Sequence, residues 1–537
     1  MTELYNYEKA FESKENPQSM WGSNKFYLNI FDKNNGIYLP NTQVQLDTAL
    51  LYSAPEWWGK SESSIQIPYQ ITAHVTTAGK SFKSTADLKK LVCLNGDAVC
   101  ILDACSVNIQ GQQITRLESQ NNINANFQLI STMCENYKNT SASQHGFVLQ
   151  EGDPDYSAEY GETIYHGDVF DKKADLMCDV SDAKFAKFQS QNNVENREKD
   201  HYIKNSSVLM TWNYLVDIPL NSINDILRKM PDMMHGAHLK LNLLVHTGEV
   251  TLLQTANDIS NVSVSTPHGT LPYMINSSLL KANVTAGANA TSIRFQSSIK
   301  KTKDAVSANP LNSSAVSMRC AMHKPRPEFN SHLQKRGVVK MDYTSFTTKF
   351  RNSINPNEFI RENITSSTSK ARYLLMFFKH SASVNFSTNS TDTALAGANS
   401  PIDPMESPFS SCPVTSKPYC SITDFNVDVG SQRLWERESA HTTQLMFKDT
   451  FQTFNSLDGA ENLQLSNGII AKELYEKLYA GYIVVDLNKY TTINEWVGIK
   501  SLDVSFKNNT LNKMDCIMQL FEEESIGMNV NTGELAV

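Results

Sequence analysis

The residues that could support chemistry are scattered, and none stands in a spacing that defines a catalytic motif. The sequence has no GxGxxG, GxSxG or HExxH pattern. Gly59-Lys60-Ser61 and Gly79-Lys80-Ser81 resemble the end of a phosphate-binding loop. The first glycine of that loop is missing in both cases, since Ala54 and His74 stand in its place. We therefore predict ordinary turns there and no nucleotide cofactor.

Two groups of side chains could be considered as metal ligands. His235 and His238 form an HxxH pair, but no third ligand has a motif context, so two polar loop residues are favoured. An acidic, glycine-bearing loop lacks the twelve-residue spacing of an EF-hand and is interpreted as a solvated loop; its acids are Asp153, Asp155, Glu159 and Glu162. We predict no metal site, no catalytic residues and no enzyme activity.

Candidate binding surfaces are also confined to short stretches of the sequence. The basic stretches 299–303 and Lys335-Arg336 could face phosphate, but charged surface loops are the favoured interpretation. Several tryptophans could stack on a carbohydrate, although packing in a core or interface is the commoner use; they are Trp57, Trp58, Trp212, Trp435 and Trp496.

Length and composition limit the classes of protein. With 537 residues, the chain exceeds the ~250–300 residues at which one core stops growing, so at least two domains are expected. A net charge of −8 gives no overall attraction to nucleic acid. No apolar run approaches the ~18 residues of a membrane span. The first residues carry both charge signs and no apolar segment, which predicts a loose arm and not a secretory signal. Nine cysteines without a CxxC pair predict buried thiols in a reducing compartment.

The elements that must position these residues have the pattern of β-strands. Residues 64–75 alternate apolar and polar, although Pro68 predicts an edge position or a bulge. The last third repeats an order of apolar run, polar turn and apolar run, as in 482–487 and 499–506. The fold class is therefore all-β, with two β-rich halves and short helices in long loops.

Helices and long polar segments interrupt this pattern. Residues 222–230 have the spacing of a helix, and 126–137 favour a helix slightly. The stretch 145–200 reads as a large surface excursion. A second polar region, 258–317, is where we expect the boundary between the halves.

Six segments, in the same order along the chain, resemble the double jelly-roll major capsid proteins of polinton-like viruses, adintoviruses and virophages. They cover about two thirds of the chain: 105–137, 211–246, 372–380, the proline-rich loop that includes SPIDPMESPFSS and leads to 421–434, GYIVVDL at 481–487, and 501–521. Residues 145–200 and 258–317 match nothing in that family.

The resemblance implies two consecutive eight-stranded jelly rolls. With the boundary above, it predicts an N-terminal arm at 1–25, jelly rolls at 26–265 and 266–522, and a C-terminal tail at 523–537. It also implies a structural major capsid protein, located in the virion and not secreted, whose homotrimer is a pseudo-hexagonal capsomer that tiles an icosahedral shell. Expected partners are copies of the chain, neighbouring capsomers, penton and minor capsid proteins, and an internal membrane or the genome on the inner face; no small-molecule substrate is expected.

Other classes stay open at the level of sequence. A minor capsid or spike protein with one jelly roll would be shorter. A carbohydrate-binding or adhesive β-sandwich would normally be secreted. A glycoside hydrolase needs two carboxylates at a fixed separation, which sequence alone does not exclude.

Overall fold

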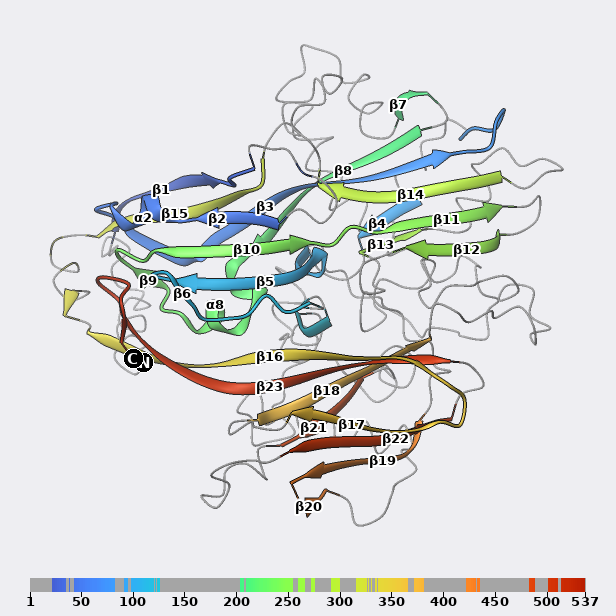
Figure 1. Ribbon diagram of the computed structural model, residues 1–537. Coiled ribbons are helices and arrows are strands. Elements are labelled where there is room, and N and C mark those ends of the chain that lie inside the picture. The colour runs from blue at the N-terminus through green and yellow to red at the C-terminus, as the bar shows by residue number, and fades with distance from the viewer. Residues whose placement is uncertain are drawn as a thin grey trace, which may run out of the picture.

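A computed structural model gives the fold of the chain (Figure 1). The residues it describes are 22–34, 38, 43–82, 91–94, 98–119, 121, 123–125, 203–206, 209–254, 259–265, 272–275, 291–299, 315–325, 327, 330, 334–335, 337–365, 371–380, 422–430, 432–434, 482–487, 501–509 and 513–536. The predicted helix at 126–137, the excursion at 145–200 and the acidic loop at 153–162 lie outside these ranges.

The first half of the chain folds into two facing antiparallel sheets. Its eight principal strands, in chain order, are β1 (Gly22–Phe31), β2 (Gln43–Asp47), β3 (Trp57–Val75), β5 (Leu102–Ile109), β6 (Gln112–Gln113), β8 (Leu209–Pro219), β10 (Leu239–Val245) and β15 (Ser317–Pro325). One sheet has the order β1-β15-β3-β8, and the other has the order β2-β10-β5-β6.

The second half repeats this arrangement. Its strands are β16 (Val338–Ile354), β17 (Phe359–Thr365), β18 (Ala371–His380), β19 (Ile422–Val429), β20 (Gln432–Arg433), β21 (Tyr482–Asp486), β22 (Leu502–Asn508) and β23 (Met514–Asn529). The sheets are ordered β16-β23-β18-β21 and β17-β22-β19-β20. Counted along each half, both have the strand orders 1-8-3-6 and 2-7-4-5. Each half is therefore a jelly roll, and the predicted all-β double jelly roll is confirmed.

The remaining elements decorate this frame. The first sheet is extended by β14 (Thr291–Ile299), β11 (Glu249–Gln254) and β12 (Ile259–Ser265). Short pieces are β4 (Val92–Leu94), β7 (Ile203–Ser206), β9 (Met233–Met234), β13 (Tyr273–Ile275), β24 (Leu535–Ala536), the 3-10 turn η2 (Ala98–Ile101), and the helices α2 (Ala49–Tyr52), α7 (Leu220–Ile223) and α8 (Asp225–Lys229). The helix predicted at 222–230 corresponds to α7 and α8.

Each jelly roll has its own core between its sheets, built from strands with alternating buried side chains. In β3, the odd-numbered residues from Ile65 to Val75 point into the first core. Phe425, Val504 and Leu520 belong to the second core. Two separate cores meet the expectation that a chain of this length divides its apolar residues.

Pro68 does not mark an edge. It lies inside the sheet, opposite Leu215 of β8. On the other side of β3, pairing with β15 ends at Gln66 and pairing with β14 begins at Tyr69. Proline, which has no backbone N–H, is tolerated at position 68 because the neighbour of β3 changes from β15 to β14 at that point.

The boundary between the jelly rolls lies later than the predicted 265/266. The strands β14 and β15 both pair with β3, so residues up to Pro325 complete the first roll, and the second roll begins with β16 at Val338. The polar region 258–317 contains strands β12 and β14, and the alternating polar residues of β14 face outward. Polarity alone misplaced the boundary, because a half-exposed strand can be as polar as a loop.

The predicted terminal segments also need correction. The tail at 523–537 is largely strand, since β23 pairs with β16 as far as Asn529 and also pairs with β24 at Gly527 and Met528. The arm at 1–25 overlaps β1, which begins at Gly22; residues 1–21 lie outside the described part of the chain.

Leu502 and Leu50 provide a matched test of the second core. Leu502→Ala should lower the free energy of unfolding by about 2–5 kcal/mol, because Leu502 is 1% exposed between the sheets. The control Leu50→Ala, at a side chain that is 60% exposed, should change it by less than about 0.5 kcal/mol. Denaturant unfolding followed by fluorescence measures both, and equal losses would contradict this assignment of the core.

Candidate functional site: the junction between the two jelly rolls

The structure separates the residues that sequence suggested as phosphate or metal ligands. Gly59, Lys60 and Ser61 lie inside β3, so the predicted turn there is wrong, whereas Gly79 does lie in a turn, with a φ of +74°. His238 Nε2 lies 2.7 Å from Asp47 Oδ1, and His235 contacts the backbone of Asn531. Within the described ranges, no three His, Cys, Asp or Glu side chains are grouped to hold a metal.

The aromatic candidates that are described have structural surroundings, whereas Lys335 of the basic pair is exposed. Trp58 and Trp212 are buried in the first core, and Trp57 Nε1 donates to Asn330 at 3.0 Å. Trp435, Trp496, residues 300–303 and the acidic loop fall outside the described residues. Across the described part, no helix is long and apolar enough to cross a bilayer.

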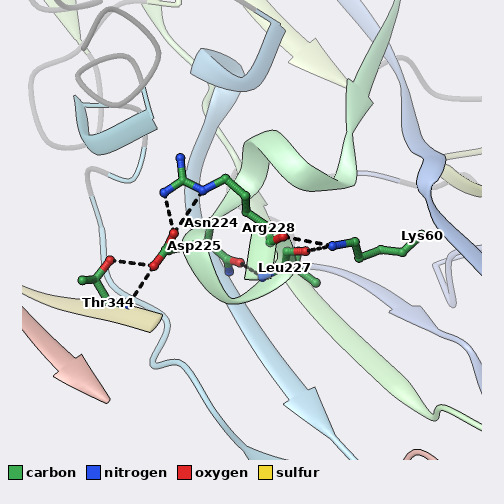
Figure 2. A network of polar contacts seen from close by, with 6 residues as sticks. All are labelled: Lys60, Asn224, Asp225, Leu227, Arg228 and Thr344. Carbon is green, nitrogen blue, oxygen red and sulfur yellow. Dashed lines mark hydrogen bonds and ion pairs between the residues drawn. The ribbon is translucent and has the colours of Figure 1, made fainter. Parts of the chain in front are cut away.

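The most concentrated polar network instead surrounds α8 and leads to the second jelly roll (Figure 2). Lys60 is fully buried, and its Nζ donates to the carbonyl oxygens of Leu227 at 2.6 Å, Arg228 at 3.1 Å and Met230 at 2.6 Å. These carbonyl groups lie at the C-terminal end of α8, where they would otherwise lack hydrogen-bond donors. Burial lowers the pKa of Lys60 to about 8, although the Asp232 carboxylate 3.7 Å away opposes this shift. Lys60 thus fixes α8 to β3.

At the other end of α8, Asp225 reaches across to the second roll. Its Oδ2 accepts hydrogen bonds from the backbone N–H of Thr344 at 2.9 Å and from Thr344 Oγ1 at 3.0 Å (Figure 2). Its Oδ1 accepts from the Arg228 guanidinium. Burial alone would raise the pKa of Asp225, but Arg228 and the Thr344 N–H outweigh it and hold the pKa below the ordinary 3.8. Asn224 caps the helix by accepting from Leu227 N at 3.0 Å, which orients the acid.

A second pair of polar contacts lies four residues further along β16. Glu118 accepts from the Thr348 N–H at 3.3 Å, and Thr348 Oγ1 donates to the carbonyl of Ser119 at 3.0 Å. Since β23 lies on only one side of β16, the other side of this strand would leave alternate N–H groups without partners. Acidic side chains of the first roll satisfy two of them at Thr344 and Thr348.

The turn after β23 closes the other end of the junction. The His235 N–H donates to the Val530 carbonyl at 3.0 Å, and Gln110 Nε2 donates to the carbonyls of Gly236 and Thr532. Gly533 has a φ of +68°, and a Cβ on it would lie 2.6 Å from Ala237 Cα. Only glycine therefore permits this approach of the two backbones.

Apolar contacts join the rolls as well. Met341, Tyr343 and Met528 belong to the second roll by sequence but pack into the core of the first. Side chains on both faces of β18 are buried, so the run from Tyr373 to Phe378 is continuously apolar. Leu374, Met376 and Phe378 lie in the second core, and Tyr373, Leu375 and Phe377 are buried on the opposite face.

The junction therefore resists rotation of one jelly roll against the other, because apolar contacts and hydrogen bonds act at several separated points. It offers no group of side chains arranged for catalysis within the described residues. Sequence patterns did not indicate that Asp225 and Gly533 lie at the junction, or that Lys60 holds α8. The only local signal was Asn224-Asp225 at the start of a short helix, which is typical of a cap and says nothing about a partner.

The strand orders and the junction define a double jelly-roll protein. No family profile and no curated protein matches the sequence. Among solved structures, the chain is similar to a chain of the Sputnik virophage, with 12% identity, a TM-score of 0.48 and coverage of 98% of this chain and 91% of that one.

Two major capsid proteins are similar over comparable lengths. The mavirus protein has 10% identity and a TM-score of 0.46, with 99% and 93% of the two chains covered. The Faustovirus protein has 9% identity and a TM-score of 0.40, with 97% and 94% covered. Since all three TM-scores lie below 0.5, the topology and contacts of this chain have to carry any functional assignment.

The charge of Asp225 can be tested by pH. Asp225→Asn should lower the free energy of unfolding at pH 7 by about 1–3 kcal/mol, because it removes a carboxylate from Arg228 and Thr344. The folded pKa lies below 3.8, so this contribution is present above pH 3.8 and is lost as the pH falls through the folded pKa. The difference between wild type and variant should therefore shrink in acid. Asp342→Asn, at an exposed acid of β16, is the control and should show neither effect.

Lys60 gives a second prediction. Lys60→Met keeps the length of the side chain but leaves the three carbonyls without their donor, so unfolding should become easier by roughly 2 kcal/mol or more. Lys240→Met, on the more exposed face of β10, is the matched control. Calorimetric melting of both variants measures the effect, and an unchanged melting temperature for Lys60→Met would show that Lys60 does not support α8.

Proposed function

We propose that this chain is a major capsid protein whose homotrimer forms a pseudo-hexagonal block of an icosahedral shell. The observation that carries the proposal is the repetition of one strand order in two jelly rolls that are held rigidly together. Three such chains would place six similar units around one axis. A block with that outline can tile a closed surface.

The way in which the junction uses its buried charges supports a structural role over a catalytic one. Its buried charges are used to satisfy backbone groups, as Asp225 does at Thr344 and Lys60 at the end of α8. Its role would be to keep the two rolls at one angle, since a tile that bends at its centre could not form a regular shell. The partners in this proposal are copies of the chain and neighbouring capsomers. Penton and minor capsid proteins, and a membrane or genome beneath the shell, are the further expected contacts.

The solution mass of the purified chain tests the proposal. Light scattering coupled to gel filtration should show a species of about 180 kDa, three times the 60.2 kDa of one chain, that persists on dilution. Electron microscopy of that species should show six-lobed outlines. A species of one chain mass at high concentration would overturn the proposal and favour an adhesive β-sandwich.

A further inference from the structure

One pair of strands contributes side chains to the cores of both jelly rolls. β16 and β23 pair along their length, from Val338 opposite Asn529 to Ile354 opposite Met514. At one end of this two-stranded ribbon, the buried side chains belong to the second core: Ile354, Met514, Cys516, Met518 and Leu520. At the other end they belong to the first core: Met341, Tyr343 and Met528. We call this second part, residues 338–345 of β16 and 522–529 of β23, the ribbon end.

The ribbon end fills part of the first core and does not merely touch it. Met341, Tyr343 and Met528 are 3%, 4% and 0% exposed. Val339 and Ile526, which stand opposite Met528 and Met341 in the ribbon, are partly buried against the same core. Because protein cores are close-packed, removing these side chains would leave a cavity and not a smooth surface. The first core is therefore incomplete without the second roll.

Polar contacts hold the ribbon end on the first roll at its edge and beyond its tip. At the edge, Asp225 accepts from the backbone N–H of Thr344. Beyond the tip, Val530 is fully buried, and its carbonyl accepts from the His235 N–H. The ribbon end thus has a fixed place on the first roll.

The pairing of β16 with β23 depends in turn on the second roll. They are the first and last strands of that roll, and the far half of the ribbon lies in the second core. If the second roll unfolded, the two strands would separate and the first core would lose the ribbon end. The dependence runs in one direction, because within the described residues the second core contains side chains of the second roll alone.

We propose that the ribbon end is a strap through which the second jelly roll completes the first, so that the first roll is stable only while the second is folded. Domains that are joined by a linker alone can open independently of each other. Here an opened second roll would always be accompanied by an opened first roll. The coupling is a property of one chain and does not require the proposed capsomer.

The use of the strap in assembly does rest on the proposed capsomer. A chain whose second half has not folded would also lack a finished first roll, so it would offer no half-native surface to other subunits. The strap would thus restrict assembly to chains in which both rolls are folded.

Hydrogen exchange of the full chain, followed by mass spectrometry in denaturant below the unfolding transition, tests the coupling. Ile71→Val removes one methylene group from the first core, at a fully buried position of β3. Exchange of the β10 amides should become about twofold to tenfold faster. Exchange of the β22 amides, in the second roll, should become faster by the same factor, because that roll opens only when the first is lost as well.

Leu50→Ala, at an exposed side chain of the first roll, is the control and should change neither rate. If Ile71→Val speeds exchange in β10 and leaves β22 unchanged, the second roll opens while the first stays folded, and the proposal is overturned.

Met528→Ala tests the strap itself. The variant removes a ribbon-end side chain from the first core, so β10 should exchange about tenfold faster or more. A β10 that exchanges at the wild-type rate in this variant would show that the ribbon end does not belong to the first core, which would also overturn the proposal. A monomeric chain that shows both effects would support the strap and overturn only the capsomer. A trimer without them would do the reverse.

Discussion

The unpaired side of β16 is the constraint on which the arrangement of the two jelly rolls depends. A jelly roll closes its core between two sheets but leaves edge strands, and each edge carries backbone donors that need partners. Here the partners at Thr344 and Thr348 come from Asp225 and Glu118 of the other roll. The same hydrogen bonds therefore satisfy the edge strand and fix the angle between the two rolls.

The buried charges at the junction are consistent with this role. A buried carboxylate is costly unless it is paired and hydrogen-bonded, and Asp225 has both a guanidinium and backbone and hydroxyl donors. Lys60 is buried behind it and holds the helix that presents the acid. Both residues act on backbone groups. Lys60 thus acts within the first roll, and Asp225 makes the contact with the second.

Much of the fold could be predicted from sequence, because the side chains of a strand alternate between two faces. Burial of one face therefore places apolar residues at every second position. The alternation at 64–75 and the ordered segments of the last third correspond to β3, β21, β22 and β23. Two predictions failed because they depended on what surrounds a strand in the folded protein. Pro68 suggested an edge but lies where one neighbouring strand replaces another. The region 258–317 looked like a linker because its strand β14 exposes a polar face.

What the sequence determined by itself was the all-β class, the presence of two units and the short helix at 222–230, because these follow from local patterns of polarity and capping. The position of the boundary and the junction were decided only by tertiary structure. The pairing of β15 with β1 joins residues almost 300 positions apart, and Asp225 meets Thr344 across 119 positions. No local pattern encodes such a partner, because the same acid at the start of a helix is equally compatible with solvent. Only the packing of the two rolls makes it a buried acceptor.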